Sequence, residues 1–90
     1  MRSNAIRVNA RDNVAVVVHP VKKGGPVVVD GQHLLDAAED ILLGHKVALA
    51  PLSPGEKVFR YGEPIVEATQ DIGVGAWVHV HNTRPIPADA

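Results

Sequence analysis

The chain has 90 residues, of which 46% are hydrophobic, and its formal net charge at pH 7 is −1. The near-neutral charge and the scarcity of aromatic residues argue against a nucleic-acid partner, and the absence of cysteine excludes disulfides and thiolate metal sites. No apolar run approaches the ~20 residues that span a bilayer and the N-terminus has no signal-peptide core, so we expect a cytoplasmic protein without membrane contact.

Valine is frequent in this chain, which favours strands over helices. We expect strands at 5–9, 14–18, 27–29 and 32–35, and the almost continuous apolar run at 14–18 predicts burial on both faces. Asp30-Gly31 is favoured in tight hairpin turns. Helical character is confined to 36–43, where Asp36 could act as a cap and Gly44 would end the helix. This stretch is too short to stand alone, so we expect one or two turns at most.

Further short strands are expected at 46–49, 57–60, 65–68 and 77–81, separated by proline and glycine. We expect one domain over 1–90, with an ordered core at about 5–84. The tail at 85–90 contains Pro85 and Pro87 and is expected to be mobile.

One spacing recurs along the chain: an aliphatic residue, glycine three positions later and valine six positions later. Glycine permits a tight turn with positive φ, after which the valine would re-enter the core as part of a strand. This repetition predicts a strongly bent, all-β fold of short strands. The four copies are Val21-Gly24-Val27, Ile41-Gly44-Val47, Leu52-Gly55-Val58 and Ile72-Gly75-Val78.

The stretch 78–84 alternates apolar and polar residues near the C-terminus. In a strand, Val78 and Val80 would face the core, and His79 and His81 would stand together on the opposite face. Two imidazoles with a neighbouring amide and guanidinium, from Asn82 and Arg84, could bind a metal or a polyoxygenated anion. The alternative is a pair of solvated histidines on the open face of an antiparallel sheet.

Two other places combine donors with a turn. His45 and Lys46 follow the Gly44 turn, where His45 could be a base or a ligand and Lys46 could bind a carboxylate as a point charge. Arg60 suits a bidentate grip on a carboxylate, and Tyr61 adds a hydroxyl. In both places a solvated surface pair is the alternative.

The remaining candidates carry less chemistry. His19 and His33 have no polar cluster near them in the sequence, so we interpret both as structural or exposed. Trp77 would lie on the histidine side of its strand, packed under that face or against a partner. The glycines do not form a phosphate-binding loop, and neither serine has the spacing of a nucleophile elbow.

Taken together, three segments resemble a known family. The chain is similar to the SAF domain (antifreeze-like, β-clip fold) at the N-terminus of altronate and galactarate dehydratases, and the same domain forms the small subunit of relatives such as sulfolactate sulfo-lyase. The resemblance extends from about Ile6 to Arg84, and it departs from the family at Val66, where a glycine is usual. The segments are 40–49 (DILLGHKVAL), 58–65 (VFRYGEPI) and 75–82 (GAWVHVHN).

The resemblance implies β-elimination from a sugar acid or a related 2-hydroxy acid, assisted by a divalent metal, iron or manganese. Most of the catalytic machinery would lie in a large dehydratase-like subunit, and ligand sites favour such boundaries between chains. By resemblance, the site residues are His45, His79 and His81 as catalytic groups, His79 and His81 also as candidate metal ligands, and Lys46, Asn82, Arg60 and Tyr61 as substrate-binding groups.

A second hypothesis treats the chain as a stand-alone SAF module for ligand binding or assembly, without catalysis. A homo-oligomer also stays open at this point, as do the substrate and the metal.

Overall fold

The computed structural model describes residues 2–88, and in these residues it contains strands and turns and no helix, which confirms the all-β prediction. Most of the strands are only two to four residues long. Their bounds are β1 Ala5–Ile6, β2 Val14–Val17, β3 Pro26–Val29, β4 Gln32–Asp36, β5 Lys46–Ala48, β6 Lys57–Arg60, β7 Glu63–Ala68, β8 Trp77–Val78 and β9 Thr83–Arg84.

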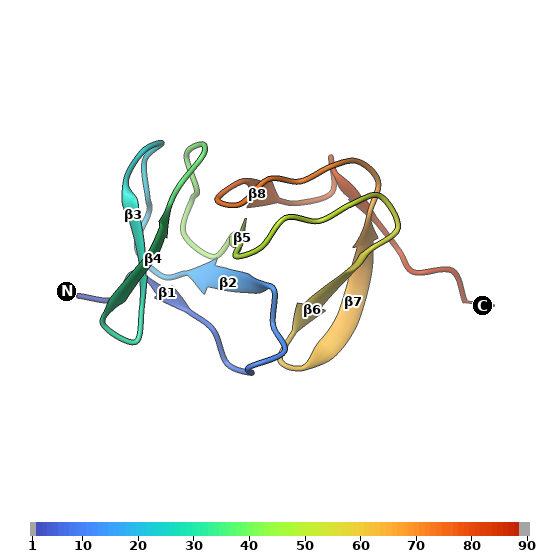
Figure 1. Cartoon of the computed structure of the whole chain (residues 1–90), viewed down its shortest axis with the longest axis horizontal. Helices are drawn as coiled ribbons and strands as arrows, with labels where there is room; N and C mark the ends of the chain where they lie inside the picture. Colours follow the sequence, from blue (N-terminus) through green and yellow to red (C-terminus); the bar gives the residue numbers. More distant parts are fainter. Residues whose placement is uncertain (1, 89–90) are drawn as a thin grey trace.

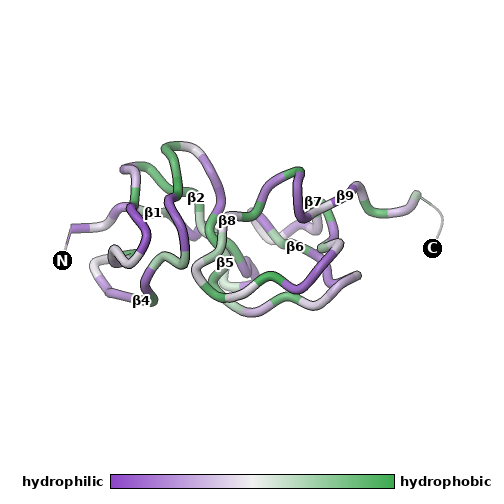
Figure 2. The backbone as a smooth tube through the Cα atoms, turned by 90° about the horizontal axis from the view of Figure 1, so that it is seen from above, coloured by the Kyte–Doolittle hydropathy of each residue, from purple (hydrophilic) through white to green (hydrophobic). Residues whose placement is uncertain are grey.

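The molecule is elongated, with a central sheet between two hairpins (Figure 1). The antiparallel sheet β1-β2-β5-β8 occupies the middle. The hairpin β3–β4 lies at one end, and the sheet β6-β7-β9 lies at the other. The principal extents are 43 × 23 × 19 Å. Figure 2 shows that the N-terminal and C-terminal parts of the described chain lie at opposite ends of the long axis.

The central sheet has a hydrophobic core on each face. Ala15 and Val47 are paired across β2 and β5 and belong to the core beside β3–β4, whereas Val14 and Ala48 are paired and belong to the core beside β6–β7. Because successive side chains of a strand point to opposite faces, β2, β5 and β8 each contribute to both cores. The predicted burial of the second strand on both faces is therefore confirmed.

The repeated spacing organises the fold into two similar units, about 21–48 and 52–79. In each unit the two aliphatic residues form an isolated bridge, Val21 with Ile41 and Leu52 with Ile72. The four turn glycines have φ between +83° and +87°. The four valines that follow are fully buried, each contributing roughly 1.5–3 kcal/mol from burial. The valines are Val27, Val47, Val58 and Val78.

The two hairpins match in detail. Their turns, Asp30-Gly31 and Tyr61-Gly62, both have two successive residues with positive φ, and a register shift occurs at the equivalent place in each. In each hairpin, an asparagine side chain forms hydrogen bonds with the backbone on both sides of this register shift. Asn4 binds the Pro26 carbonyl and the Val28 N–H, as Asn13 binds the Lys57 carbonyl and the Phe59 N–H.

The hairpin tips are tied down by different groups. The Ser3 hydroxyl accepts a hydrogen bond from the Gly31 N–H, at 2.9 Å. At the other tip the buried Asp12 carboxylate accepts from the N–H groups of Tyr61 and Gly62, at 3.0 and 2.7 Å. A charged acceptor therefore holds the turn that carries Tyr61.

The predicted helical turns at 36–43 are wrong. The backbone groups of this segment bond to other segments: the Ala37 N–H donates to Gly25, the Ala38 N–H to Gly75 and the Ile41 N–H to Val21. Burial of Ala37 and Ile41 in the core stabilises this extended path. That stabilisation outweighs the weak helical preference of a short segment.

Four strands are also shorter than predicted, two of them by three residues. The first ends at Ile6, where residues through 9 were expected, and β8 ends at Val78, where residues through 81 were expected. Val80 consequently lies in a turn with 78% of its surface exposed, so its predicted place in the core is wrong. Mobility of the tail stays a prediction, and residues 89 and 90 lie outside the described range.

Candidate functional site

The candidate site lies where β5 begins and β8 ends. These strands are antiparallel neighbours, with Lys46 opposite Val78 and Val47 opposite Trp77. The residue before β5, His45, is thereby brought beside the residue after β8, His79. Their ring centroids are 5.1 Å apart.

Trp77 lies at the centre of the histidine cluster, which we define as His45, His79 and His81. Its indole stacks on the His79 ring at 4.9 Å with an interplanar angle of 14°, and it contacts the His81 ring at 4.8 Å. The indole Nε1–H also donates a hydrogen bond to Nδ1 of His45, at 2.8 Å. One aromatic side chain therefore touches all three imidazoles.

Asn82 shapes the turn that carries the other two histidines. Its Oδ1 accepts from the His79 N–H at 2.9 Å, and its Nδ2 donates to the Trp77 carbonyl at 2.8 Å. The residue is only 3% exposed. The Asn82 amide thus holds the turn from inside, where the resemblance implied contact with substrate.

Two cations extend the cluster along β5 and β6. Lys46 is partly buried, and this burial, followed by the nearby positive charge of Arg60, lowers the pKa of its ammonium group. The Arg60 guanidinium lies over the Tyr61 ring at 4.7 Å and donates to the Tyr61 hydroxyl at 3.3 Å, but its buried Nε has no partner. Within residues 2–88, no carboxylate forms an ion pair with Lys46 or Arg60.

The neighbours of His79 favour its neutral form. Partial burial is the largest cause of a lowered imidazole pKa, and the charge of Lys46 and the charges that His45 and His81 would carry in their protonated forms add to it. The neutral ring that this favours can accept or donate a hydrogen bond.

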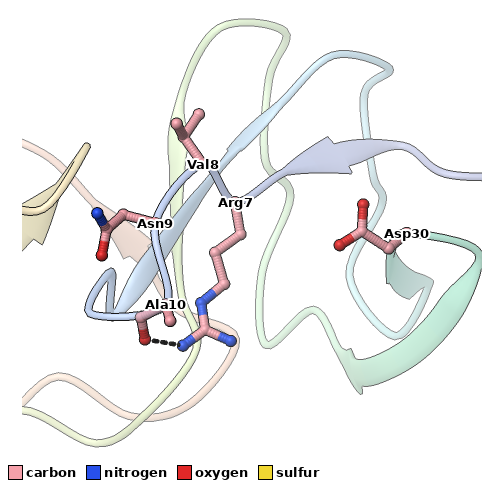
Figure 3. Close-up of a pocket in the computed structure, with 5 residues that line it drawn as sticks. All are labelled: Arg7, Val8, Asn9, Ala10 and Asp30. Atoms are coloured by element: carbon pink, nitrogen blue, oxygen red, sulfur yellow. Dashed lines mark hydrogen bonds between the residues drawn. The ribbon is translucent and has the colours of Figure 1, made fainter.

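The cluster lies on an open surface. Two hollows of about 270 and 280 Å³ occur elsewhere, one lined by Arg2, Ser3, Asn4 and His19 and the other beside Arg7. Figure 3 shows the second hollow, where the Arg7 guanidinium turns back to the Ala10 carbonyl of its own loop and Asp30 stands opposite. Neither hollow includes a residue of the cluster.

Comparison with known proteins places the chain in a family. The family model for the altronate/galactarate dehydratase SAF domain matches residues 3–85. The chain belongs to this family. The SAF domain described here is 43% identical over 79 residues to altronate dehydratase of Escherichia coli (strain K12), a match covering 88% of this chain and 16% of that protein. The chain thus spans a small fraction of the dehydratases that it matches.

Smaller relatives match over most of their own length. The SAF domain is 34% identical over 82 residues to (2R)-sulfolactate sulfo-lyase subunit alpha of Chromohalobacter salexigens, covering 84% of this chain and 87% of that subunit. It is 46% identical over 50 residues to the subunit alpha of Paracoccus pantotrophus, covering 56% of this chain and 75% of that subunit. In residues 2–88 no helix is long and apolar enough to cross a membrane.

The divalent metal implied by the family does not fit a site made by the SAF domain alone. No group of three or more His, Asp or Glu residues among 2–88 is placed to hold an ion. Nδ1 of His45 already accepts the indole hydrogen bond, which leaves that atom unavailable as a ligand in this arrangement. The residues present therefore supply an incomplete ligand set.

The structure separates the predicted site residues into three groups. His45, His79 and His81 meet around Trp77, with Lys46 beside them and Arg60 near Lys46. Tyr61 is exposed at the hairpin tip, and Asn82 is internal. The remaining histidines lie apart: His33 bonds Asp36 in β4, and His19 lines a hollow.

Sequence reasoning missed the roles of two residues of the site. Trp77 was placed on the correct face, but its bond to His45 depends on a pairing between distant strands. Glu39, whose carboxylate accepts from the Trp77 N–H at 2.9 Å, lies in the 36–43 stretch that was predicted to be helical. Val66, at the departure from the family pattern, pairs with Val58 and packs against the second core.

Proposed function

We propose that this SAF domain is a small-subunit-type component of a hydro-lyase, and that its cationic and imidazole rim completes the active site of a large dehydratase-like chain. The substrate is a sugar acid such as altronate or galactarate, or a related 2-hydroxy acid such as sulfolactate. Support comes from the family, from the names of relatives of similar length, and from the open position of the cluster.

The unpaired cations are the observation that carries the proposal. Lys46 and Arg60 lie close enough for the charge of Arg60 to lower the pKa of Lys46, and neither has a carboxylate partner in the described residues. Placing two like charges together in a partly buried place is unfavourable until an anion joins them. A substrate carboxylate, bound through the free donors of Arg60 and Lys46, would supply that anion.

The histidines suit the remaining chemistry. Elimination next to a carboxylate needs stabilisation of an enediolate and a proton donor for the departing group. His45 and His79 lie side by side within reach of the Lys46 charge, and His81 is exposed beside them. These groups can bind, orient and protonate oxygen atoms of a substrate that another chain presents.

The large chain carries the rest of the site in this proposal. It covers the open cluster, excludes water and holds the divalent metal, iron or manganese, because this domain offers an incomplete ligand set. In this proposal the assembled lyase acts in the cytoplasm.

Substitutions in the assembled enzyme test the proposal. The SAF domain is produced together with a large dehydratase-like chain, and turnover of altronate, galactarate and sulfolactate is measured. His45→Ala and His79→Ala are each expected to lower kcat about 10²–10⁴-fold, the usual loss when one positioned hydrogen-bond or proton donor is removed.

His33→Ala is the matched control, because this exposed histidine lies in the β3–β4 hairpin away from the cluster. It should leave the rate unchanged. Full activity of both His45→Ala and His79→Ala would contradict a catalytic rim. Tight calorimetric binding of a sugar acid by the lone domain, without turnover in any mixture, would instead indicate a stand-alone binding module.

A further inference from the structure

Hydrogen bonds with two side chains and pairing within a sheet fix the backbone of Trp77. Its backbone N–H donates to Oε2 of Glu39 at 2.9 Å, and its carbonyl accepts from Nδ2 of Asn82 at 2.8 Å. Pairing of Trp77 with Val47 fixes it within the central sheet. The side chain of Glu39, from a distant segment, and that of Asn82, from the turn after β8, therefore orient the residue whose indole contacts all three histidines.

The direction of the indole bond determines the protonation pattern of His45. The indole Nε1–H can only donate, so Nδ1 of His45, at 2.8 Å, must be an unprotonated acceptor. A neutral imidazole with a bare Nδ1 carries its proton on Nε2. Among residues 2–88 the structure gives His45 Nε2 no hydrogen-bond partner, so this N–H is free to meet a ligand.

We propose that Trp77 is a positioning residue that holds His45 as the Nε2–H tautomer, so that His45 acts on the substrate as a hydrogen-bond donor and not as a base. The acceptor is an anionic oxygen, that of the carboxylate or of the enediolate that forms from it. The substrate-facing part of this statement rests on the proposed function, whereas the tautomer is a property of the domain itself.

The tautomer is read by nitrogen NMR of the chain labelled with ¹⁵N-histidine, in chelator-treated buffer at a pH where imidazoles are neutral. We expect His45 to show an unprotonated Nδ1 and a protonated Nε2. In Trp77→Phe, which keeps an aromatic ring but removes the donor, the ratio of tautomers should shift about 5–10-fold towards Nδ1–H, the effect of losing one hydrogen bond. His33 signals serve as the internal control.

Two results would overturn the tautomer assignment. One is a wild-type His45 with its proton on Nδ1, and the other is an unchanged ratio in a Trp77→Phe variant whose amide spectrum shows a native fold. If Trp77→Phe fails to fold, the wild-type spectrum alone still decides which nitrogen carries the proton.

Turnover of the assembled enzyme tests the donor role separately. Glutamine keeps an N–H donor and lacks acid–base capacity, so His45→Gln should retain at least 10-fold more kcat than His45→Ala. Trp77→Phe should lower kcat more than it raises KM. Equal loss in His45→Gln and His45→Ala overturns the donor role, whereas full activity in both contradicts the proposed function and leaves the tautomer to the NMR result.

Discussion

At the scale of single residues, most polar side chains with low exposure in this domain hold backbone in place. Asn4 and Asn13 each bond main-chain groups of a distant segment, Asn82 bonds those of its own turn, and Asp12 accepts from main-chain N–H groups. Such bonds satisfy donors and acceptors that short strands leave unpaired. The side chains of Lys46 and Arg60 bond no main-chain group among residues 2–88 and point towards a ligand.

Asp12 offers the clearest test of these anchoring bonds. Asp12→Asn removes one acceptor oxygen beside the N–H groups of Tyr61 and Gly62 and is expected to lower the free energy of unfolding by roughly 1–3 kcal/mol. Asp71→Asn, at an exposed carboxylate without a hydrogen bond among the described residues, should change little. Chemical denaturation measures both.

The effect of Asp12 should depend on pH. Burial alone would raise its carboxyl pKa, but hydrogen bonds from the N–H groups of Gly62, Asn9 and Tyr61, with the charge of Arg7, lower it below the ordinary value of 3.8. Because the pKa is lower in the folded state, the ionised Asp12 carboxylate stabilises the fold above pH 3.8. This stabilisation is lost as the pH falls through the pKa of the folded state. The difference between wild type and Asp12→Asn should therefore shrink in acid, and a constant difference would contradict this cause.

At the scale of elements, the repeated glycine turns could be predicted from the sequence, because the spacing indicates positions that need a positive φ. The atoms that surround each turn could not be predicted. A Cβ on Gly55 would meet no atom within 4 Å, whereas a Cβ on Gly75 would lie 2.5 Å from the Asp36 carbonyl oxygen and 2.9 Å from the Ala38 nitrogen. Two turns of the same spacing, both in the second unit, thus face open space in one case and the 36–38 segment in the other.

Alanine substitutions separate these two situations. Gly55→Ala and Gly75→Ala share the cost of positive φ, roughly 1–2 kcal/mol. Gly75→Ala should lose about 1–3 kcal/mol more, because backbone must move to admit the methyl group. Thermal and denaturant unfolding of the two variants tests the order, and equal losses would contradict the close approach.

The last strand depends on one buried carboxylate. Glu67 in β7 accepts from Lys57 at 3.1 Å and from Arg84 in β9 at 2.7 Å, and these two hydrogen bonds lower its pKa. Glu67→Gln should speed amide hydrogen exchange at Thr69 and in β9, with exchange in the β3–β4 hairpin unaltered. Glu63→Gln, at an exposed position of the same strand, is the control, and unchanged exchange in Glu67→Gln would show that β9 is held without the ion pairs.

At the scale of the whole molecule, local sequence patterns correctly predicted the features that depend on neighbouring residues. The Asp30-Gly31 turn, the buried run at 14–18 and the all-β class all follow from residue preferences and periodicity. The prediction of a helix at 36–43 was wrong because the backbone of this segment forms hydrogen bonds with distant parts of the chain. The grouping of His45 with His79 could be inferred from the family resemblance. The hydrogen bond from Trp77 to His45 could not, because it depends on the pairing of strands that are distant in sequence.

The two-unit architecture also explains why the site lies on the outside. Both cores are filled by small aliphatic side chains, and the cluster sits at the strand ends, where His45 and His79 are half-buried and His81 is exposed. In the proposed function, this rim encloses a substrate when a large dehydratase-like chain closes over it.

Reconstitution of activity from separate chains tests this claim most directly. The purified SAF domain and the purified large dehydratase-like chain are assayed alone and mixed, with altronate, galactarate and sulfolactate as substrates. We predict no turnover by either chain alone and a rate that rises with added domain until it saturates. A large chain that reaches the full rate without the domain would contradict the account.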